Sequence, residues 1–469
     1  MKFVIVGGGI SGWLSALIFS HRKPNHEYVI IESSDVNTIG VGEGTTGLFV
    51  QTIEELPDIN VAEFLRETKA TPKIGIEFNN WSGKGSTFFN PIDGTPTTNE
   101  DFDSFLYFTY TENPSLDTSS LHGLLKRKNK SPYTEKLKDY NSALHLDNKL
   151  TIQYLKSKSL KRKNIKYISD TVSKIERDET GKVEKIICSN NIIEGDIFID
   201  CSGYSRIFSE KSDWVSFKNN LPMNSVTTFT RKHNVSMVTK ADKLNLGWCW
   251  QIPTQERIGC GYVSCDQWGN SVIDEIKSNY PDAEILKSFK FDSGKLKKSW
   301  NHNVISLGLA YHFLEPLQAT NIHLTLVQID ILCQRCIRQT KDRTINPDVI
   351  SIYNKHIDNL IEDFKNFINI HYSRDSRVTL TDYNKKIISL LKVRGLFFED
   401  LPQLYGCSGI GLWGHTLLGL NHLTKQECHN FLSEMNLYEE VKEISSELQT
   451  IFKNTSFISY QELIKKLSI

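Results

Sequence analysis

The first 32 residues carry the feature that most constrains the fold. Residues 2–6 form a short apolar run rich in β-branched side chains, a glycine cluster follows at 7–12, and a helical pattern continues through Ile18. A second apolar run at 28–31 ends in Glu32. A strand, a glycine turn, a helix and a second strand that ends in an acid form the signature of a βαβ dinucleotide-binding unit.

The spacing of the glycines assigns a task to each of them. Gly7, Gly9 and Gly12 allow a tight turn, a close approach of the backbone to a pyrophosphate, and close packing of the helix on the strand. The helix N-terminus offers unpaired N–H groups to phosphates, and Glu32 can accept hydrogen bonds from ribose hydroxyls. The sequence therefore predicts a dinucleotide site, which FAD or a nicotinamide could fill.

Length and charge restrict the class of protein. The 469 residues can form two or three domains or one large discontinuous enzyme. Since 55 basic residues balance 55 acidic ones, no global field recruits nucleic acid or an anionic membrane. The apolar stretch 401–423 is broken by glycines and by His415, so we expect no membrane span.

The nine cysteines are scattered, and the sequence opens directly into a strand with no signal peptide. We therefore expect reduced thiols and a cytoplasmic protein. Cys333 and Cys336 form a lone CxxC without a second pair or a histidine at zinc spacing, so no metal site is predicted.

Two tryptophans at alternate positions mark the run Gly-Trp-Cys-Trp-Gln-Ile-Pro at 247–253. In a strand, Trp248, Trp250 and Ile252 point to one face, so two indoles wall a single surface. The pattern is compatible with ordinary core packing or with a flat partner nearby.

Three later segments add to the evidence for a dinucleotide site. A glycine-rich loop occupies 39–46, a buried strand runs into a turn at 195–206, and a strand, a loop and a helix follow one another at 304–323. Together with Thr71-Pro72-Lys73-Ile74-Gly75 and the Trp-x-Trp-x-Ile-Pro run, these segments resemble the flavin-dependent halogenases of the tryptophan halogenase family. The resemblance favours FAD over a nicotinamide.

The resemblance implies an α/β fold: a glutathione-reductase-type FAD-binding Rossmann module with an inserted substrate-side sheet and a helical C-terminal part. We expect the FAD module at 1–345, with sheet insertions near 76–140 and 210–300, and a helical subdomain at 346–469 that covers the substrate. The residues implied to contact the cofactor are Gly7, Gly9, Ser11, Gly12, Trp13, Glu32, Gly42, Glu43, Thr45, Val172, Asp200, Gly203, Gly308 and Leu317.

The chemistry of the family implies roles for further residues. Reduced FAD, O2 and halide give hypohalous acid, which travels through a tunnel to a lysine beside the aromatic substrate. Lys73 matches that lysine, and Trp248 and Trp250 match the tryptophans that keep substrate from the flavin. The backbone amides of Thr320 and Asn321 correspond to the halide site. For His145, a structural role is the expectation.

The chain departs from the family where a glutamate and a serine usually precede Thr-Gly. It carries Gln318-Ala319 and then Thr320-Asn321. Gln318 cannot act as a base, so water or Glu315 can take its place. Asn321 is expected to need a backbone conformation that suits glycine and to loosen the halide site, which predicts better use of bromide or iodide than of chloride.

These inferences predict an FADH2-dependent halogenase that modifies an electron-rich aromatic of the indole or phenol type. A separate flavin reductase is expected as partner, because no second nicotinamide fingerprint is present. Two alternatives stay open: a single-component FAD hydroxylase that uses NAD(P)H, and a flavin-binding relative that no longer halogenates.

Overall fold

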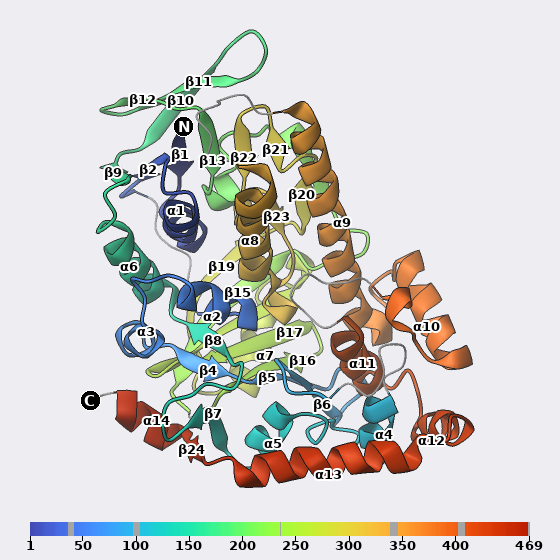
Figure 1. Ribbon diagram of the computed structural model, residues 1–469. Helices are drawn as coiled ribbons and strands as arrows, with labels where there is room; N and C mark the ends of the chain where they lie inside the picture. Colours follow the sequence, from blue (N-terminus) through green and yellow to red (C-terminus); the bar gives the residue numbers. More distant parts are fainter. Residues whose placement is uncertain (36–41, 97–103, 235, 338–345, 402–408, 468–469) are drawn as a thin grey trace.

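The computed structural model describes residues 1–35, 42–96, 104–234, 236–337, 346–401 and 409–467 (Figure 1). The first residues of the predicted 39–46 loop and Cys407 therefore lie outside the described residues. Within the described parts, no helix is both long and apolar enough to span a bilayer.

The N-terminal βαβ unit forms the centre of a six-stranded sheet with the order β21-β22-β13-β1-β2-β9. Its strands are parallel except β21, which pairs antiparallel with β22 at one edge. The bounds are β1 Lys2–Val6, β2 Glu27–Glu32, β9 Ile165–Ser169, β13 Ile197–Asp200, β21 Trp300–Asn301 and β22 Val304–Ser306.

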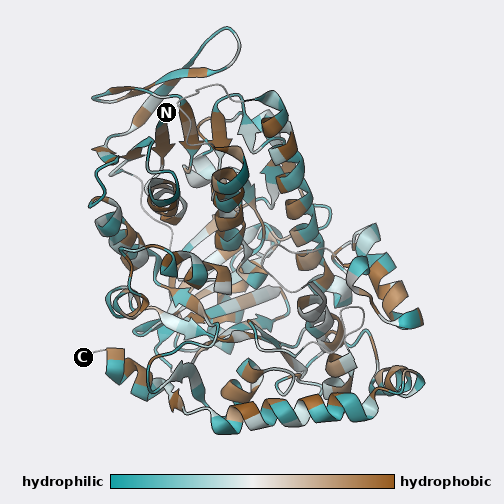
Figure 2. Ribbon diagram, in the orientation of Figure 1, coloured by the Kyte–Doolittle hydropathy of each residue, from teal (hydrophilic) through white to brown (hydrophobic). Residues whose placement is uncertain are grey.

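Alternate residues of β1 face two different layers. Phe3 and Ile5 belong to the main core with helices α1 (Ile10–Arg22) and α8 (Thr320–Ile331), whereas Val4 and Val6 pack on a three-stranded meander. A parallel sheet must be buried on both faces, so its strands are apolar throughout. Figure 2 shows this contrast between the apolar strands beside the N-terminus and the largely hydrophilic meander. The meander consists of β10 Val172–Arg177, β11 Val183–Cys188 and β12 Ile192–Glu194.

A second, seven-stranded sheet draws its strands from the two ranges predicted to form the inserted sheet. The order is β19-β15-β18-β17-β16-β5-β6, and only the β16–β5 pair is parallel. The bounds are β5 Gly75–Asn79, β6 Thr87–Pro91, β15 Ser225–Lys232, β16 Val238–Lys243, β17 Gly247–Pro253, β18 Arg257–Ser264 and β19 Glu284–Lys290.

Short strands and helices connect the two large sheets. Ala143–Leu146 forms strand β8, and Asp147 caps the following helix by accepting from Leu150 N. The small sheets are β3-β8-β4 and β14-β20-β23. The remaining bounds are β3 Glu43–Gly44, β4 Thr71–Lys73, β14 Trp214–Ser216, β20 Gly294–Leu296, β23 His312–Phe313, α2 Gly47–Glu54, α3 Val61–Thr68, α4 Ser104–Glu112, α5 Leu121–Arg127, α6 Asn148–Ser159 and α7 Ser271–Asn279.

The chain beyond residue 345 is mainly helical, as its periodicity predicts. Its one strand in the described part, β24, pairs with β7 far back in the chain, and the long helix α13 runs along the base of the molecule in Figure 1. The bounds are α9 Pro347–His371, α10 Asp382–Arg394, α11 Gly409–Gly419, α12 Lys425–Glu434, α13 Tyr438–Asn454, α14 Tyr460–Leu467, β7 Lys130–Thr134 and β24 Phe457–Ser459. The predicted α/β class is confirmed.

Candidate active site

Three short strands bring Lys73 next to the glycine-rich loop that follows residue 41. β8 pairs with β3 on one side and with β4 on the other, so Gly44 and Thr71 both lie opposite His145. Lys73 ends β4, is only 1% exposed, and donates from Nζ to Thr45 O at 3.0 Å. The Lys73 amine is therefore buried and held by a hydrogen bond to the backbone.

His145 ties these strands to the second sheet. The Thr71 hydroxyl donates to Pro253 O at 2.7 Å, so it accepts from His145 Nδ1 at 3.1 Å, and His145 Nε2 accepts from Thr239 Oγ1 at 2.8 Å. Burial, followed by the Lys73 charge, holds the pKa of His145 well below its usual value. A neutral imidazole with both nitrogens engaged supports a structural role.

The turn from 315 to 321 approaches Gly44 beside Lys73. A Cβ placed on Gly44 would lie 3.1 Å from Lys73 Nζ and 3.5 Å from Ala319 Cβ. Ala319 has φ +56°, a left-handed conformation that reverses the chain into α8. The small residues at 44 and 319 therefore leave space around the amine.

Glu315 is fully buried in this turn. Tyr372 donates its hydroxyl to Glu315 Oε2, while Oε1 has no hydrogen-bond partner among the described residues. Burial raises the pKa of Glu315 to about 7, against the lowering effect of Tyr372 and of the Trp248 indole. A carboxyl group that changes charge near neutral pH is suited to proton transfer.

Gln318 faces a histidine to which sequence reasoning gave no role. Gln318 Nε2 lies 2.9 Å from His371 Nε2, and His371 Nδ1 lies 2.8 Å from Phe367 O in the last turn of α9. Burial lowers the pKa of His371 to about 4, so the ring is neutral. Nothing in the local sequence links His371 to Gln318.

The two tryptophans of β17 form part of an aromatic wall. The Trp248 and Trp250 ring centroids are 5.9 Å apart, and Trp81 lies 6.1 Å from Trp248. Trp250 covers Gly261, where a Cβ would fall 2.1 Å from the indole. Ile252, on the same face, lies 3.4 Å from a Cβ placed on Gly42. This face of β17 therefore extends from the Gly42 loop to the turn that carries Glu315.

The N-terminal glycines have the geometry of a dinucleotide site. Gly7 has φ +123°, and a Cβ there would fall 2.1 Å from Cys201 O; a Cβ on Gly12 would fall 1.9 Å from Gly7 O. Gly9 has nothing within 4 Å of its Cβ position, so open space lies where a pyrophosphate is expected. Glu32 ends β2 and accepts from Lys156 Nζ at 2.5 Å.

Asp200 offers the clearest test of whether FAD fits. Its Oδ1 accepts from Ser202 N and Oγ at 2.9 and 2.6 Å, but the buried Oδ2 has no partner in the described structure. Burial raises the pKa of Asp200. An orphaned buried carboxylate oxygen requires a donor such as a cofactor hydroxyl, so this residue fits FAD.

Three further predicted cofactor residues follow the same N-terminal unit or pack near it. Ser11 lies on the first turn of α1 with its Oγ 2.5 Å from a Cβ placed on Gly308, while Gly203 (φ +66°) borders open space. Trp13 is fully buried; its backbone N–H donates to Gly9 O, and its indole Nε1 has no partner among the described residues.

The predicted cofactor residues Glu43, Val172 and Leu317 lie in three different elements. Glu43 is partly exposed and burial raises its pKa to about 7, against a hydrogen bond from Asn148. Val172 begins β10 and is partly exposed, and Leu317 is buried in the turn before α8.

The predicted halide residues begin helix α8. Thr320 is the first helical residue, and its buried Oγ1 has no partner among the described residues. The first amides of a helix lack intrahelical acceptors and attract anions. The expectation for Asn321 is wrong in its geometry: this residue is helical, and its side chain turns back to Leu314, donating to the carbonyl at 3.1 Å and accepting from the amide at 3.4 Å.

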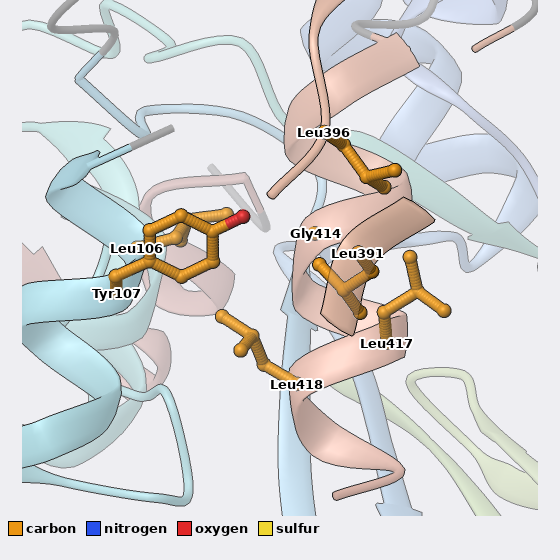
Figure 3. Close-up of a pocket in the computed structure, with 7 residues that line it drawn as sticks. All are labelled: Leu106, Tyr107, Leu391, Leu396, Gly414, Leu417 and Leu418. Atoms are coloured by element: carbon orange, nitrogen blue, oxygen red, sulfur yellow. The ribbon is translucent and has the colours of Figure 1, made fainter. Parts of the chain in front are cut away.

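A small apolar cavity lies beside α4, between it and the α10–α11 region. Its volume is about 10 Å³, enough for one water and far too small for an indole. It is lined by Leu106, Tyr107, Leu391, Leu396, Gly414, Leu417 and Leu418 (Figure 3). We therefore do not place the aromatic substrate there.

Known proteins share both the sequence pattern and the fold. The sequence model of the tryptophan halogenase family matches residues 2–405. Tryptophan 7-halogenase RebH of Lentzea aerocolonigenes is 25% identical over 409 residues, 79% of this chain and 76% of the relative. Tryptophan 6-halogenase ThaL of Streptomyces albogriseolus is 24% identical over 422 residues, 80% of this chain and 76% of the relative.

The solved structure of Xcc4156, a flavin-dependent halogenase from Xanthomonas campestris, superposes with a TM-score of 0.84 at 22% identity, covering 99% of this chain and 98% of that one. This likeness concerns the fold. With the family match over most of its length, the chain belongs to the tryptophan halogenase family, and it is a flavin-dependent halogenase that uses FADH2, O2 and halide.

Proposed function

We propose that this halogenase transfers halogen to an electron-rich arene of the indole or phenol type, with Lys73 as the residue that delivers it. The observation that carries the proposal is the position of the Lys73 amine, buried at 1% exposure between the Gly44 loop and the turn that bears Glu315 and Gln318. Curated relatives act on tryptophan, so its indole ring is one candidate substrate.

Reduced FAD, when bound along the Gly7–Gly12 turn and Asp200, supplies with O2 and halide the oxidised halogen as hypohalous acid. The start of α8 holds the halide, with the Thr320 amide and the unpaired Thr320 hydroxyl as donors. Trp248 and Trp250 keep the arene away from the flavin, so the oxidant and the arene meet at Lys73.

Lys73 acts on hypohalous acid by hydrogen bonding or as a nucleophile. The hydroxyl of the acid takes a proton from Lys73 and leaves as water, and the arene carbon takes the halogen. The displaced ring hydrogen departs as a proton, which returns to Lys73 after it has been accepted from the ring. Glu315 is the acceptor that we assign to this proton, since its carboxyl has an oxygen without a partner and a pKa raised to about 7 by burial. Gln318 contributes hydrogen bonds only.

The test is turnover with chemically reduced FAD, O2 and halide, without NAD(P)H, across a panel of indoles and phenols read by mass spectrometry. We expect a halogenated product that disappears in Lys73→Ala while flavin binding persists. Product that forms equally well in Lys73→Ala would refute the role of Lys73, and a hydroxylated product that requires NAD(P)H would refute halogen transfer.

We also propose that a separate flavin reductase supplies FADH2 and that the protein works in the cytoplasm. The eight cysteines in the described part are free thiols, six of them buried, which supports a reducing compartment. Addition of an unrelated flavin reductase with NADH should replace chemically reduced FAD in the same assay. Failure of every reductase, alongside success with reduced FAD, would indicate a dedicated partner.

A further inference from the structure

The contact between Gln318 and His371 determines which end of the Gln318 carboxamide faces His371. The two side chains come from the turn before α8 and from the last residue of α9, and both are buried. Resting on the proposed function, we propose that His371 is a positioning residue that fixes the Gln318 carboxamide with its nitrogen toward His371 and its oxygen toward the space shared with Lys73.

The hydrogen bonds of His371 decide its tautomer. Phe367 O, 2.8 Å from Nδ1, can only accept, so Nδ1 carries the proton. Nε2 is then a bare acceptor in a neutral ring, and it accepts from the Gln318 amide at 2.9 Å. The opposite carboxamide orientation would set the Gln318 oxygen against a lone pair, so only one orientation is compatible with both bonds.

The fixed orientation gives Gln318 a chemical use despite its lack of charge. The carbonyl oxygen lies at the far end of the carboxamide from His371, and the next residue, Ala319, approaches Gly44 beside Lys73. On this proposal, the oxygen accepts a hydrogen bond from the hydroxyl of hypohalous acid at Lys73. The carboxamide then holds the oxidant as a carboxylate would, and it leaves proton removal to another group.

The same geometry couples positions 318 and 371. The carboxylate that Gln318→Glu introduces would face the lone pair on His371 Nε2. Because both groups are then acceptors, one of them must bind a proton for the hydrogen bond to form. The His371 ring is enclosed by the rings of Phe78, Trp81 and Phe367, at centroid distances of 5.2, 6.2 and 5.0 Å. Glu315 and Tyr372, bonded to each other, are the titratable pair on the same turn and helix end.

The first test measures the tautomer by NMR on protein with ¹⁵N-labelled histidine, with His371 assigned by its absence in His371→Gln. We expect a neutral ring protonated at Nδ1 from about pH 5.5 to about pH 8. A ring protonated at Nε2 in the wild type would overturn the proposal.

The second test separates positioning from packing. His371→Phe keeps an aromatic ring but removes the hydrogen-bond acceptor. His371→Gln loses the ring but keeps an acceptor, because its Oε1 can occupy the place of Nε2. We expect kcat to fall about tenfold in His371→Phe with KM for the arene unchanged, equivalent to about 1.4 kcal/mol, and to recover to within about threefold in His371→Gln. Equal losses in both variants, with equal thermal stability and FAD binding, would contradict the proposal.

The two tests also separate this proposal from the proposed function. If the wild type halogenates none of the arenes, the proposed function fails, while the NMR result still decides the state of His371. If halogenation proceeds but His371 is protonated at Nε2, only the positioning role fails.

Discussion

Glu315 should make the stability of the protein depend on pH in a way that Glu315→Gln removes. The carboxyl is fully buried, and burial raises its pKa from 4.5 to about 7, only partly offset by Tyr372 and Trp248. The folded state therefore binds this proton more tightly than the unfolded state does. The stability that the proton confers is complete below about pH 4.5 and is lost as the pH rises to about 7.

The size of the effect follows from the shift in pKa. Each pKa unit corresponds to about 1.4 kcal/mol, so ionisation of Glu315 lowers the free energy of unfolding by about 3 kcal/mol between pH 4.5 and pH 8. Glu315→Gln keeps the shape and an oxygen that accepts from Tyr372, but it does not titrate. The variant should thus match the wild type near pH 5 and become more stable than it near pH 8.

The assay compares the thermal midpoints of wild type and Glu315→Gln in a series of buffers from about pH 5 to about pH 8.5. Other buried acids, such as Asp363 with its pKa raised to about 6 by burial, are present in both proteins and cancel. Glu427→Gln is a control of opposite sign, since capping hydrogen bonds from Thr424 lower the pKa of Glu427. A difference between wild type and Glu315→Gln that stays constant with pH would refute the reasoning.

Three further predictions concern the site. Lys73→Met, which keeps an unbranched chain of similar length without the amine, should reduce halogenation by about 10²- to 10⁴-fold while FAD titration by fluorescence is unchanged; retained turnover would remove Lys73 from the chemistry. Asp200→Asn should weaken FAD binding about tenfold or more, because Oδ2 is the buried acceptor without a partner; an unchanged Kd would place the cofactor elsewhere. Asn321→Gly removes both bonds to Leu314 and should raise KM for chloride and bromide alike by about tenfold; a gain confined to chloride would restore the idea that Asn321 crowds the halide.

The dinucleotide module could be predicted because its signals are local. The turn at Gly7, the helix contact at Gly12 and the acid at Glu32 all lie within 32 residues, and the structure assigns Gly7 and Gly12 steric tasks that no side chain could perform. Strand β17 has an equally local signal, because indoles at alternate positions match the two-residue repeat of a strand. In such segments the neighbours in sequence are also the neighbours in space.

The contacts around Lys73 could not be predicted in the same way. β3, β8 and β4 contain two, four and three residues, too few for any period to appear. Gln318 and His371 are separated by 53 positions, and neither residue has a local pattern that requires the other. The geometry of Asn321 was predicted wrongly because the residue type alone does not reveal its partner. Both the backbone N–H and the carbonyl of Leu314 bond to the Asn321 side chain.

The turn at 315–321 explains how the chain can differ from its family at three positions and keep the site. Three of its polar side chains have a partner: Glu315 bonds to Tyr372, Gln318 to His371, and Asn321 to Leu314.

Ala319 is constrained by its small size, whereas Glu315, Gln318 and Asn321 are constrained by their hydrogen bonds. It holds a left-handed φ of +56°, and its methyl group faces Gly44 beside the Lys73 amine. A larger side chain at 319, or any side chain at 44, would crowd the Lys73 amine. The partners at 315, 318 and 321 fix the turn, so the halogen transfer that we propose at Lys73 does not depend on a glutamate at 318.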